Sequence, residues 1–296
     1  KVVWSRADDL RHDFYRLATA NRLAARLDEA RGLQLLAHRI AAPSIARRRS
    51  PEMLERGHDF LMTQGSADHP YSIEHQLIDY HEVDLGVPVG FWRSVGHSHN
   101  GFILNGAIDE LAALGGRDPY ELRRELLAKH PRHLAVLEKA ATAAGWGKPL
   151  PAGHFHGIAL QESFGSIVAE VVEASVPDGK SVKVHKVTAA VDCGFAVNPQ
   201  QVVAQIESGV IYGLSMALYG EITLENGAVQ QGNFDSYPVA RLEETPAIEV
   251  HIVENGGPLG GIGEPGLPPL APALAGAIFA ATGKRIRRLP LAVSLA

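Results

Sequence analysis

The most distinctive stretch of the sequence lies near its C-terminal end and reads Gly256-Gly257-Pro258-Leu259-Gly260-Gly261-Ile262-Gly263-Glu264-Pro265-Gly266. An apolar run over 267–282 follows it directly. Glu264 is the one acid of the chain framed by glycines and prolines in this way, and glycine lets other groups come close to the main chain. Pro272 suits the first turn of a helix, and Gly283 suits its C-terminal end. We therefore expect Glu264 to lie just ahead of a helix.

Two interpretations of Glu264 stay open from the local sequence. A carboxylate in a turn of this composition is either solvated or caps the helix that follows it. Alternatively, it is a pre-placed general base on a loop that a rigid helix positions.

The composition is that of a globular protein with a sizeable core. Of the 296 residues, 46% are hydrophobic and 21% are charged, which suits one large domain or two smaller ones. The formal net charge of −5, without a long basic block, argues against nucleic acid as a partner. We find neither a run suited to a membrane span nor a signal peptide. A first residue that is Lys1 rather than Met indicates a processed chain or a piece of a longer one.

Hydrophobic periodicity and turn residues predict an α+β protein with mixed sheets packed against helices. Over 17–41 a helix and a hairpin compete, and Gly32 between two mixed runs favours a hairpin that turns at 28–32. Further hairpin turns are expected at 177–179 and 225–227. Helices are expected over 51–60, 101–114, 119–128, 131–144 and 198–219, and strands over 71–83, 158–160, 167–176 and 182–190.

A linker over 149–153, which contains two prolines and a glycine, is the best candidate for an internal boundary. It predicts two subdomains, one over 1–148 and the other over 149–296. Glu264 would then belong to the second subdomain.

The segment 86–100 is expected to be a loop, because aromatic, cationic and imidazole side chains gather there between glycines without helical periodicity. Arg93 lies in its middle. Its planar guanidinium suits a phosphate or carboxylate, and nearby glycines would let such a ligand approach. The alternative is a structural arginine that bonds loop carbonyls.

Two pairs of histidines, His97 with His99 and His154 with His156, would each share one face of an extended chain. Four imidazoles suit zinc or copper, but neither a carboxylate nor a cysteine joins them at a recognisable ligand spacing. We therefore predict no metal site built from the side chains of this chain alone.

Cys193 and Gln205 are further candidates for chemistry. Cys193 is the single cysteine, which excludes an internal disulfide framework and an iron–sulfur site built from this chain alone. It has no histidine close in sequence, so we expect a buried small side chain rather than a nucleophile. Gln205 is an amide among apolar neighbours, which either bonds backbone or contacts a ligand.

Taken together and in order, several motifs of the chain resemble one family. They are Phe91-Trp92-Arg93-Ser94-Val95-Gly96-His97-Ser98-His99-Asn100, Val191-Asp192-Cys193-Gly194 with Asn198-Pro199, Ala204-Gln205-Ile206-Glu207-Ser208-Gly209, and Gly261-Ile262-Gly263-Glu264-Pro265-Gly266. The chain is similar to the molybdenum hydroxylases of the xanthine oxidase type. The likeness is to the C-terminal portion of the molybdopterin-binding beta subunit of isoquinoline 1-oxidoreductase and its aldehyde-oxidising relatives, and it covers nearly the whole chain.

The resemblance implies a role for each matching residue. Glu264 would be the catalytic general base of the reaction. Cofactor contacts would come from Gly263, Gln205, Arg93 and Gly96. Trp92 and Val95 would shape the substrate channel. Ser208 stands where the family pattern leads us to expect glycine, which affects the details of the Gln205 contact.

The resemblance also implies a cofactor and partners. The cofactor would be molybdenum–molybdopterin, in its cytosine dinucleotide form. The enzyme would oxidise an aldehyde or an N-heteroaromatic ring with oxygen derived from water. Electrons would pass to iron–sulfur clusters on a small partner subunit and, in relatives of this subtype, onward to cytochrome c. The Gly-Gln-Gly cofactor loop of the family's other portion is absent, so the chain would form half of a molybdopterin-binding unit. Another polypeptide or the cleaved remainder of the same precursor would complete it.

A second hypothesis is a non-catalytic assembly or cofactor-insertion subunit that keeps the same fold, and it predicts no metal in the purified complex. A zinc hydrolase built on the four histidines is a third. The compartment expected from relatives of this subtype is periplasmic or membrane-associated, with the cytoplasm as the alternative.

Overall fold

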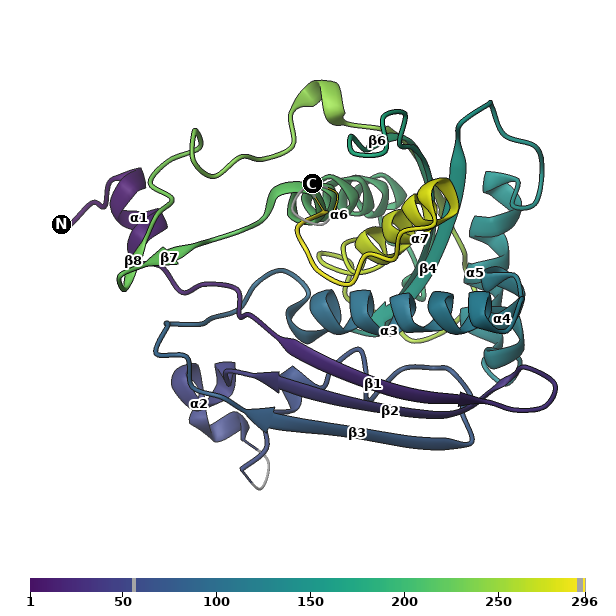
Figure 1. Cartoon of the computed structure of the whole chain (residues 1–296), viewed down its shortest axis with the longest axis horizontal. Helices are drawn as coiled ribbons and strands as arrows, with labels where there is room; N and C mark the ends of the chain where they lie inside the picture. The colour runs from purple at the N-terminus through teal and green to yellow at the C-terminus, as the bar shows by residue number, and fades with distance from the viewer. Residues whose placement is uncertain (55–56, 292–294, 296) are drawn as a thin grey trace.

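Two main sheets form the framework of the described residues, 1–54, 57–291 and 295, in this computed structural model (Figure 1). One has three strands from the first part of the chain, and the other has four strands from the second part. Helix α3 (Val95–Leu114) runs between the three-stranded sheet and helix α7 (Leu270–Thr282). The expected α+β class with mixed sheets and packed helices is therefore confirmed.

The three-stranded sheet has the order β1-β2-β3. Strand β1 (Ala20–Leu27) runs antiparallel to β2 (Leu33–Ala42), and β3 (His75–Glu82) runs parallel to β2. Asp28 closes the β1–β2 turn, because its Oδ1 accepts a hydrogen bond from the Gly32 N–H at 2.8 Å. The expected hairpin is confirmed, and alternate residues in the second half of β2 are buried, as a strand requires.

The four-stranded sheet has the order β4-β5-β6-β9. Strands β4 (Phe155–Ser163), β5 (Ser166–Ser175) and β6 (Lys183–Asp192) are antiparallel neighbours, and β9 (Ala247–Ile252) pairs parallel with β6. The first three occur where strands were expected. The sequence did not predict β9, an edge strand whose residues are mostly only partly buried, so its hydrophobic pattern is weak.

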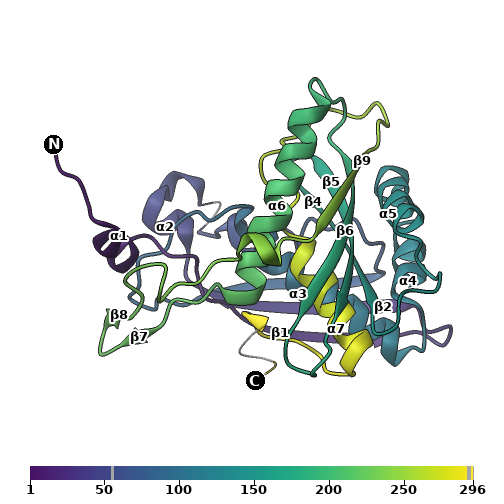
Figure 2. The ribbon, with the colours of Figure 1, turned by 90° about the horizontal axis from the view of Figure 1, so that it is seen from above.

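Helices cover both faces of the four-stranded sheet (Figure 2). Helix α5 (Pro131–Ala144) packs against β5 and β6 on one face, and α6 (Pro199–Tyr219) packs with α7 on the other. Strand β5 is buried over most of its length, as expected of a strand covered on both sides. Asn198 caps α6, because its side chain accepts a hydrogen bond from the Gln201 N–H at 3.3 Å. Among the described residues, α6 alone has the length and composition to cross a membrane, and 50% of its apolar window is buried in the protein.

Two expectations from the sequence are wrong, namely the extent of the loop over 86–100 and the helix over 51–60. Helix α3 begins at Val95, so the expected loop over 86–100 ends earlier than predicted. Its first turns are buried on all sides, and a helix without a polar face gives no amphipathic signal. The expected helix over 51–60 is only a short 3₁₀ turn, η1 (Pro51–Met53), and Glu55 and Arg56 fall outside the described residues.

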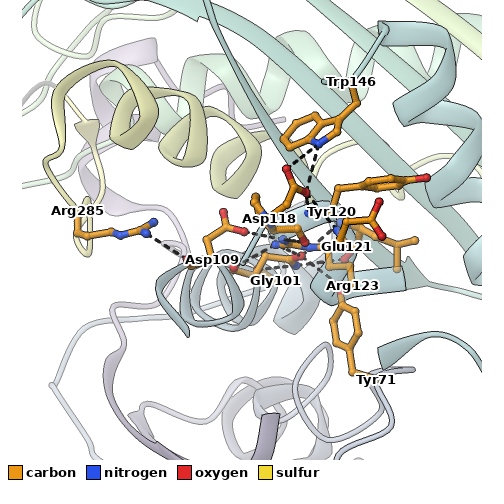
Figure 3. Close-up of polar contacts among 12 residues, drawn as sticks. Tyr71, Gly101, Asp109, Asp118, Tyr120, Glu121, Arg123, Trp146 and Arg285 are labelled. Carbon is orange, nitrogen blue, oxygen red and sulfur yellow. Dashed lines mark hydrogen bonds and ion pairs between the residues drawn. The ribbon is translucent and has the colours of Figure 1, made fainter. Parts of the chain in front are cut away.

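A buried polar network holds α3 in place (Figure 3). Arg123, from α4 (Pro119–Leu126), is fully buried and bonds Asp109 of α3 at 2.5 Å and the Asn105 carbonyl at 3.1 Å. Asn105 in turn donates to the Leu160 carbonyl of β4 at 3.1 Å, and Arg285 donates to the Asp109 carbonyl at 3.1 Å. The network therefore links α3 to α4, to β4 and to the segment after α7.

The remaining elements are short. They are α1 (Arg6–His12), α2 (Ile45–Arg49), η2 (Phe60–Met62), β7 (Leu224–Glu225), β8 (Ala228–Val229) and η3 (Leu242–Glu244). Strands β7 and β8 form the hairpin expected at 225–227. The division into subdomains at 148 and 149 stays a prediction.

Candidate active site

Glu264 lies at the N-terminal end of α3, far from it in sequence. Its Oε1 accepts a hydrogen bond from the Ser94 N–H at 2.8 Å, and the Ser94 hydroxyl donates to the Glu264 carbonyl oxygen at 2.8 Å. The N-terminus of a helix favours a negative charge, so this position stabilises the carboxylate. Oε2 of Glu264 receives no hydrogen bond from any described residue. One oxygen is thus fixed and the other is left for chemistry.

Ser94 and Val95 have unusual backbone conformations. Their φ angles are +73° and +44°, although neither is glycine. A β-branched residue at positive φ is strained, and such strain gathers at functional sites. The Val95 N–H donates to the Trp92 carbonyl at 2.8 Å, which tightens the turn into α3. This turn places the Ser94 N–H against Glu264.

Arg93 ties three separate segments together. Its Nε and Nη2 donate to the Gly263 carbonyl at 2.9 and 2.5 Å. Nη2 also donates to Gln205 Oε1 at 3.3 Å, and Nη1 donates to Ser208 Oγ at 3.0 Å. The structure therefore brings together Arg93, Gln205 and Gly263, as the sequence suggested. Much of the guanidinium is engaged by the protein, which favours the structural interpretation of Arg93.

Ser208, which the sequence marked as a departure from the family pattern, makes a hydrogen bond to Arg93 that the sequence did not predict. The family pattern led us to expect glycine there, and glycine would leave Nη1 of Arg93 without this partner. On α6, Gln205 and Ser208 are three residues apart and share a helix face, so both reach the same guanidinium.

A pocket of about 520 Å³ opens beside Glu264. Trp92, Arg93 and Val95 line it, so the expected channel residues and the expected base share one cavity. The rest of the wall consists of side chains that the sequence did not single out for this role: Met53, Phe60, Leu61, Gln64, Phe91 and Phe164. Phe164 has a φ of +53°, and its strained position in the β4–β5 turn was not evident from sequence.

The indole of Trp92 contacts two side chains. The Arg16 guanidinium carbon lies 4.3 Å from the ring centroid, and the Tyr212 ring centroid lies 5.3 Å away. Arg16 also donates to Ser98 Oγ at 3.0 Å. Burial lowers the pKa of Arg16 to about 10, which leaves it charged at neutral pH. This cation–π contact fixes one wall of the pocket.

Two glycines of the site differ in the space beside them: Gly96 allows close packing, and Gly263 leaves the main chain open to approach. A Cβ on Gly96 would lie 2.1 Å from the Leu61 carbonyl oxygen, so Gly96 lets α3 pack against the segment that contains η2. A Cβ on Gly263 would meet only Gln205 Oε1, at 4.0 Å. Gly263 therefore has open space beside its Cα, whereas Gly96 has none.

The buried histidines next to the site are neutral. Burial lowers the pKa of His97, and the negative charges of Asp68, Glu162 and Glu264 oppose that shift. Burial lowers the pKa of His99 to about 3. Neither imidazole adds a positive charge near Glu264 at neutral pH.

The two histidine pairs do not meet. The His97 ring lies 5.7 Å from that of Phe164, which follows the end of β4, whereas His154 precedes the start of β4 and stacks on His185 at 3.8 Å. A nine-residue strand, roughly 30 Å long, separates the pairs. Within 1–54, 57–291 and 295, no group of three or more His, Cys, Asp or Glu side chains is placed to hold a metal ion. Cys193 is buried, as expected.

Comparisons with known proteins find similar chains. A family model described as "Molybdopterin cofactor-binding domain" matches residues 134–246. The chain is 31% identical over 305 residues to isoquinoline 1-oxidoreductase subunit beta of Brevundimonas diminuta, covering 100% of this chain and 39% of the relative. It is 27% identical over 320 residues to the membrane-bound aldehyde dehydrogenase [pyrroloquinoline-quinone] of Gluconacetobacter polyoxogenes, covering 98% of this chain and 41% of the relative.

The fold has a counterpart among solved structures. Quinoline 2-oxidoreductase from Pseudomonas putida 86 superimposes with a TM-score of 0.78 over 98% of this chain and 63% of that chain, at 12% sequence identity. At that identity the likeness concerns the fold alone. The chain spans about two fifths of the length of the two curated relatives.

Proposed function

This chain belongs to the molybdenum hydroxylase family, and from that premise we propose that it supplies the general base and half of the cofactor pocket of an oxidoreductase. The proposed reaction is the oxidation of an aldehyde or an N-heteroaromatic ring with oxygen derived from water. The observation that carries the proposal is the contact between Ser94 and Glu264, which fixes a carboxylate on the wall of a pocket that Arg93 also lines.

The residues present fit a pterin cofactor. The open space beside Gly263 admits a planar group close to the main chain, and Gln205 presents an amide on the same side. We propose that Gly263 and Gln205 contact the cofactor, and that Arg93 holds these two residues in position. Gly96 acts by letting the first turn of α3 reach its place. The cytosine dinucleotide form is part of this proposal.

Molybdenum bound to the pterin would supply the acceptor for the two electrons that leave the substrate. The chain's own residues have other tasks. Glu264 takes up a proton at Oε2 while the Ser94 N–H holds Oε1, so the carboxylate keeps its orientation as its charge changes. Trp92, Val95 and Phe164 give the pocket an apolar wall, which orients an aromatic or aldehyde substrate and excludes water.

The chain spans about two fifths of the two curated relatives. We propose that the remaining cofactor contacts come from another polypeptide or from the remainder of the same precursor. An iron–sulfur subunit would receive the electrons, since Cys193 is the single cysteine of this chain, and cytochrome c would be the final acceptor. A periplasmic or membrane-associated location stays a prediction.

The test is elemental analysis of the complex purified from its native host with all co-purifying chains. We expect molybdenum at about one atom per chain, together with turnover of benzaldehyde or isoquinoline. A complex without molybdenum, or one that holds a quinone in its place, would overturn the proposal. The alternative, a non-catalytic assembly or cofactor-insertion subunit, predicts no metal in the purified complex and no turnover.

A further inference from the structure

A second pocket, of about 460 Å³, adjoins the active site. The residue that it shares with the Glu264 pocket is Trp92. Tyr237, Val239 and Ala240 form one side of it. The other side belongs to α6 and consists of Ser208, Ile211, Tyr212, Ser215 and Met216. A pocket of this volume suits a small organic molecule.

The segment that closes the second pocket is fixed to α6 at two points. The Ala240 N–H donates to Ser215 Oγ at 3.0 Å. The Tyr219 hydroxyl, at the end of α6, donates to the carboxylate of Glu244 in η3. These contacts lie one helical turn apart on α6, so the segment over 240–244 follows the helix. Both sides of the second pocket are therefore anchored.

Arg16 lies beside this pocket and has no counter-ion. Its guanidinium carbon is 4.3 Å from the Trp92 ring centroid, and its Nη2 donates to Ser98 Oγ at 3.0 Å. The titratable groups that act on its charge are the phenols of Tyr212 and Tyr237, which both line the pocket. Within 1–54, 57–291 and 295, no carboxylate pairs with Arg16. A desolvated charge without a partner is unfavourable, so an anion bound here would stabilise the protein.

These groups suit a carboxylate attached to a planar ring. A guanidinium binds a carboxylate through two parallel hydrogen bonds, and Nε and Nη1 of Arg16 bond no described residue. The rings of Trp92, Tyr212 and Tyr237 offer stacking surfaces. A phosphate carries up to two charges and calls for a second cation, whereas the neighbouring Arg93 already donates to protein oxygens.

We propose that the second pocket binds a planar aromatic carboxylate, whose carboxylate group bonds Arg16 and whose ring lies against Tyr212 and Tyr237. The occupant also touches Trp92 and so reaches the wall of the Glu264 pocket. Neither the binding nor its test requires the proposed reaction. One link does rest on the proposed function: an aromatic aldehyde, once oxidised, is an aromatic carboxylate, so the second pocket takes the class of molecule that the reaction yields.

Equilibrium dialysis of the complex from its native host measures the binding of benzoate and of benzamide, which has a similar shape but no charge. We expect benzoate to bind at least about tenfold more tightly, because only benzoate pairs with the Arg16 charge. Arg16→Gln should remove this preference, and Arg22→Gln, which changes an exposed arginine of β1, should keep it. No binding, equal affinities for the two ligands, or a preference that survives Arg16→Gln would overturn the proposal.

A second variant locates the ligand. Val239→Trp fills the second pocket and changes no residue that lines the Glu264 pocket, so benzoate affinity should fall at least about tenfold. Leu242→Trp, at a position that is 88% exposed and outside the pocket, is the matched control and should bind benzoate as the wild type does. Circular dichroism checks that both variants fold. Wild-type affinity in Val239→Trp would place the site elsewhere and contradict the proposal.

Crystals of the complex soaked in 4-iodobenzoate give a direct view that needs no variant. The anomalous signal of iodine should lie in the second pocket, with the carboxylate toward Arg16. A signal confined to the Glu264 pocket or to the molecular surface, or no signal, would refute the proposed site.

Molybdenum analysis of the same complex keeps the two proposals apart. Benzoate binding at Arg16 in a complex without molybdenum would keep the second pocket and remove the proposed function. A complex that holds molybdenum and turns over substrate, but binds no benzoate at Arg16, would do the reverse.

Discussion

Glu170 is a buried acid that the active site does not use. It lies on β5 between Ala159 of β4 and Ala189 of β6, and it is 0% exposed. Neither carboxyl oxygen has a hydrogen-bond partner among the described residues. Burial raises the pKa of Glu170 well above its ordinary value, because the buried carboxyl loses the water that would solvate its charge.

This position predicts a pH dependence of stability. As the pH rises past about 4.5, the unfolded chain releases the Glu170 proton while the folded chain retains it. The free energy of unfolding therefore falls with rising pH until the folded-state pKa is passed, by about 1.4 kcal/mol for each unit by which that pKa is raised. Glu170→Gln should remove this decline and be more stable than the wild type at pH 8.

Urea unfolding at pH 5 and pH 8 measures the effect. Glu29→Gln, in the exposed β1–β2 turn, is the control and should keep the wild-type slope. If Glu170→Gln loses as much stability between pH 5 and pH 8 as the wild type does, the account of Glu170 is wrong.

The second prediction about a single residue concerns Arg93. A lysine cannot bridge Gly263, Gln205 and Ser208, so Arg93→Lys should lower the free energy of unfolding by about 1–3 kcal/mol and reduce bound molybdenum. Chemical denaturation and metal analysis check the two effects. Arg39→Lys, in an exposed pair with Asp79, should change stability by less than about 1 kcal/mol. Equal effects at the two positions would show that Arg93 has no special role.

At the scale of elements, the position of α3 depends on the pair of Arg123 and Asp109. Arg123→Met would leave Asp109 buried without its partner, which should destabilise the protein by about 3–5 kcal/mol. Asp109→Leu in the same chain should recover much of that loss, because no unpaired charge then remains. Guanidinium unfolding of the single and double variants tests this, and a double variant less stable than Arg123→Met would contradict it.

The contact between α6 and the glycine-rich loop gives another test. A Cβ on Gly209 would lie 2.7 Å from the carbonyl carbon of Gly266, so Gly209→Ala must displace the segment that carries Glu264. We expect turnover to fall at least about tenfold while the circular dichroism spectrum stays unchanged. Gly106→Ala, in α3, meets nothing within 4 Å and should be tolerated or slightly stabilising. Full turnover by the Gly209 variant would show that this close approach does not matter.

Local signals predicted most of the elements. Asn198-Pro199 and Gly283 marked helix ends correctly, and Gly32 separated the strands of the first hairpin. The start of α3 was missed because His97 and its neighbours are buried polar residues, whose inward position depends on the tertiary structure. Strand β9 was missed because an edge strand shows a weak pattern.

At the scale of the whole molecule, the site joins residues far apart in sequence. The sequence named Arg93, Gln205 and Glu264 as candidates, but the motifs alone did not show the contacts that unite them. Phe164 became evident only from the structure, because it lies in a turn, and the contact of Ser208 with Arg93 was not evident from its departure from the family pattern. The division at 148 and 149 stays a prediction, and α5, from the first half, packs on the sheet of the second.

The most direct test of the account is the replacement of Glu264 by glutamine in the complex from the native host. Glutamine preserves size and still accepts the Ser94 hydrogen bond, but it cannot take up a proton. We predict that Glu264→Gln retains the molybdenum of the wild type and loses turnover of benzaldehyde by about 10²–10⁴-fold. Glu29→Gln should leave both unchanged. Wild-type turnover by a molybdenum-loaded Glu264→Gln variant would contradict the assignment of Glu264 as the general base.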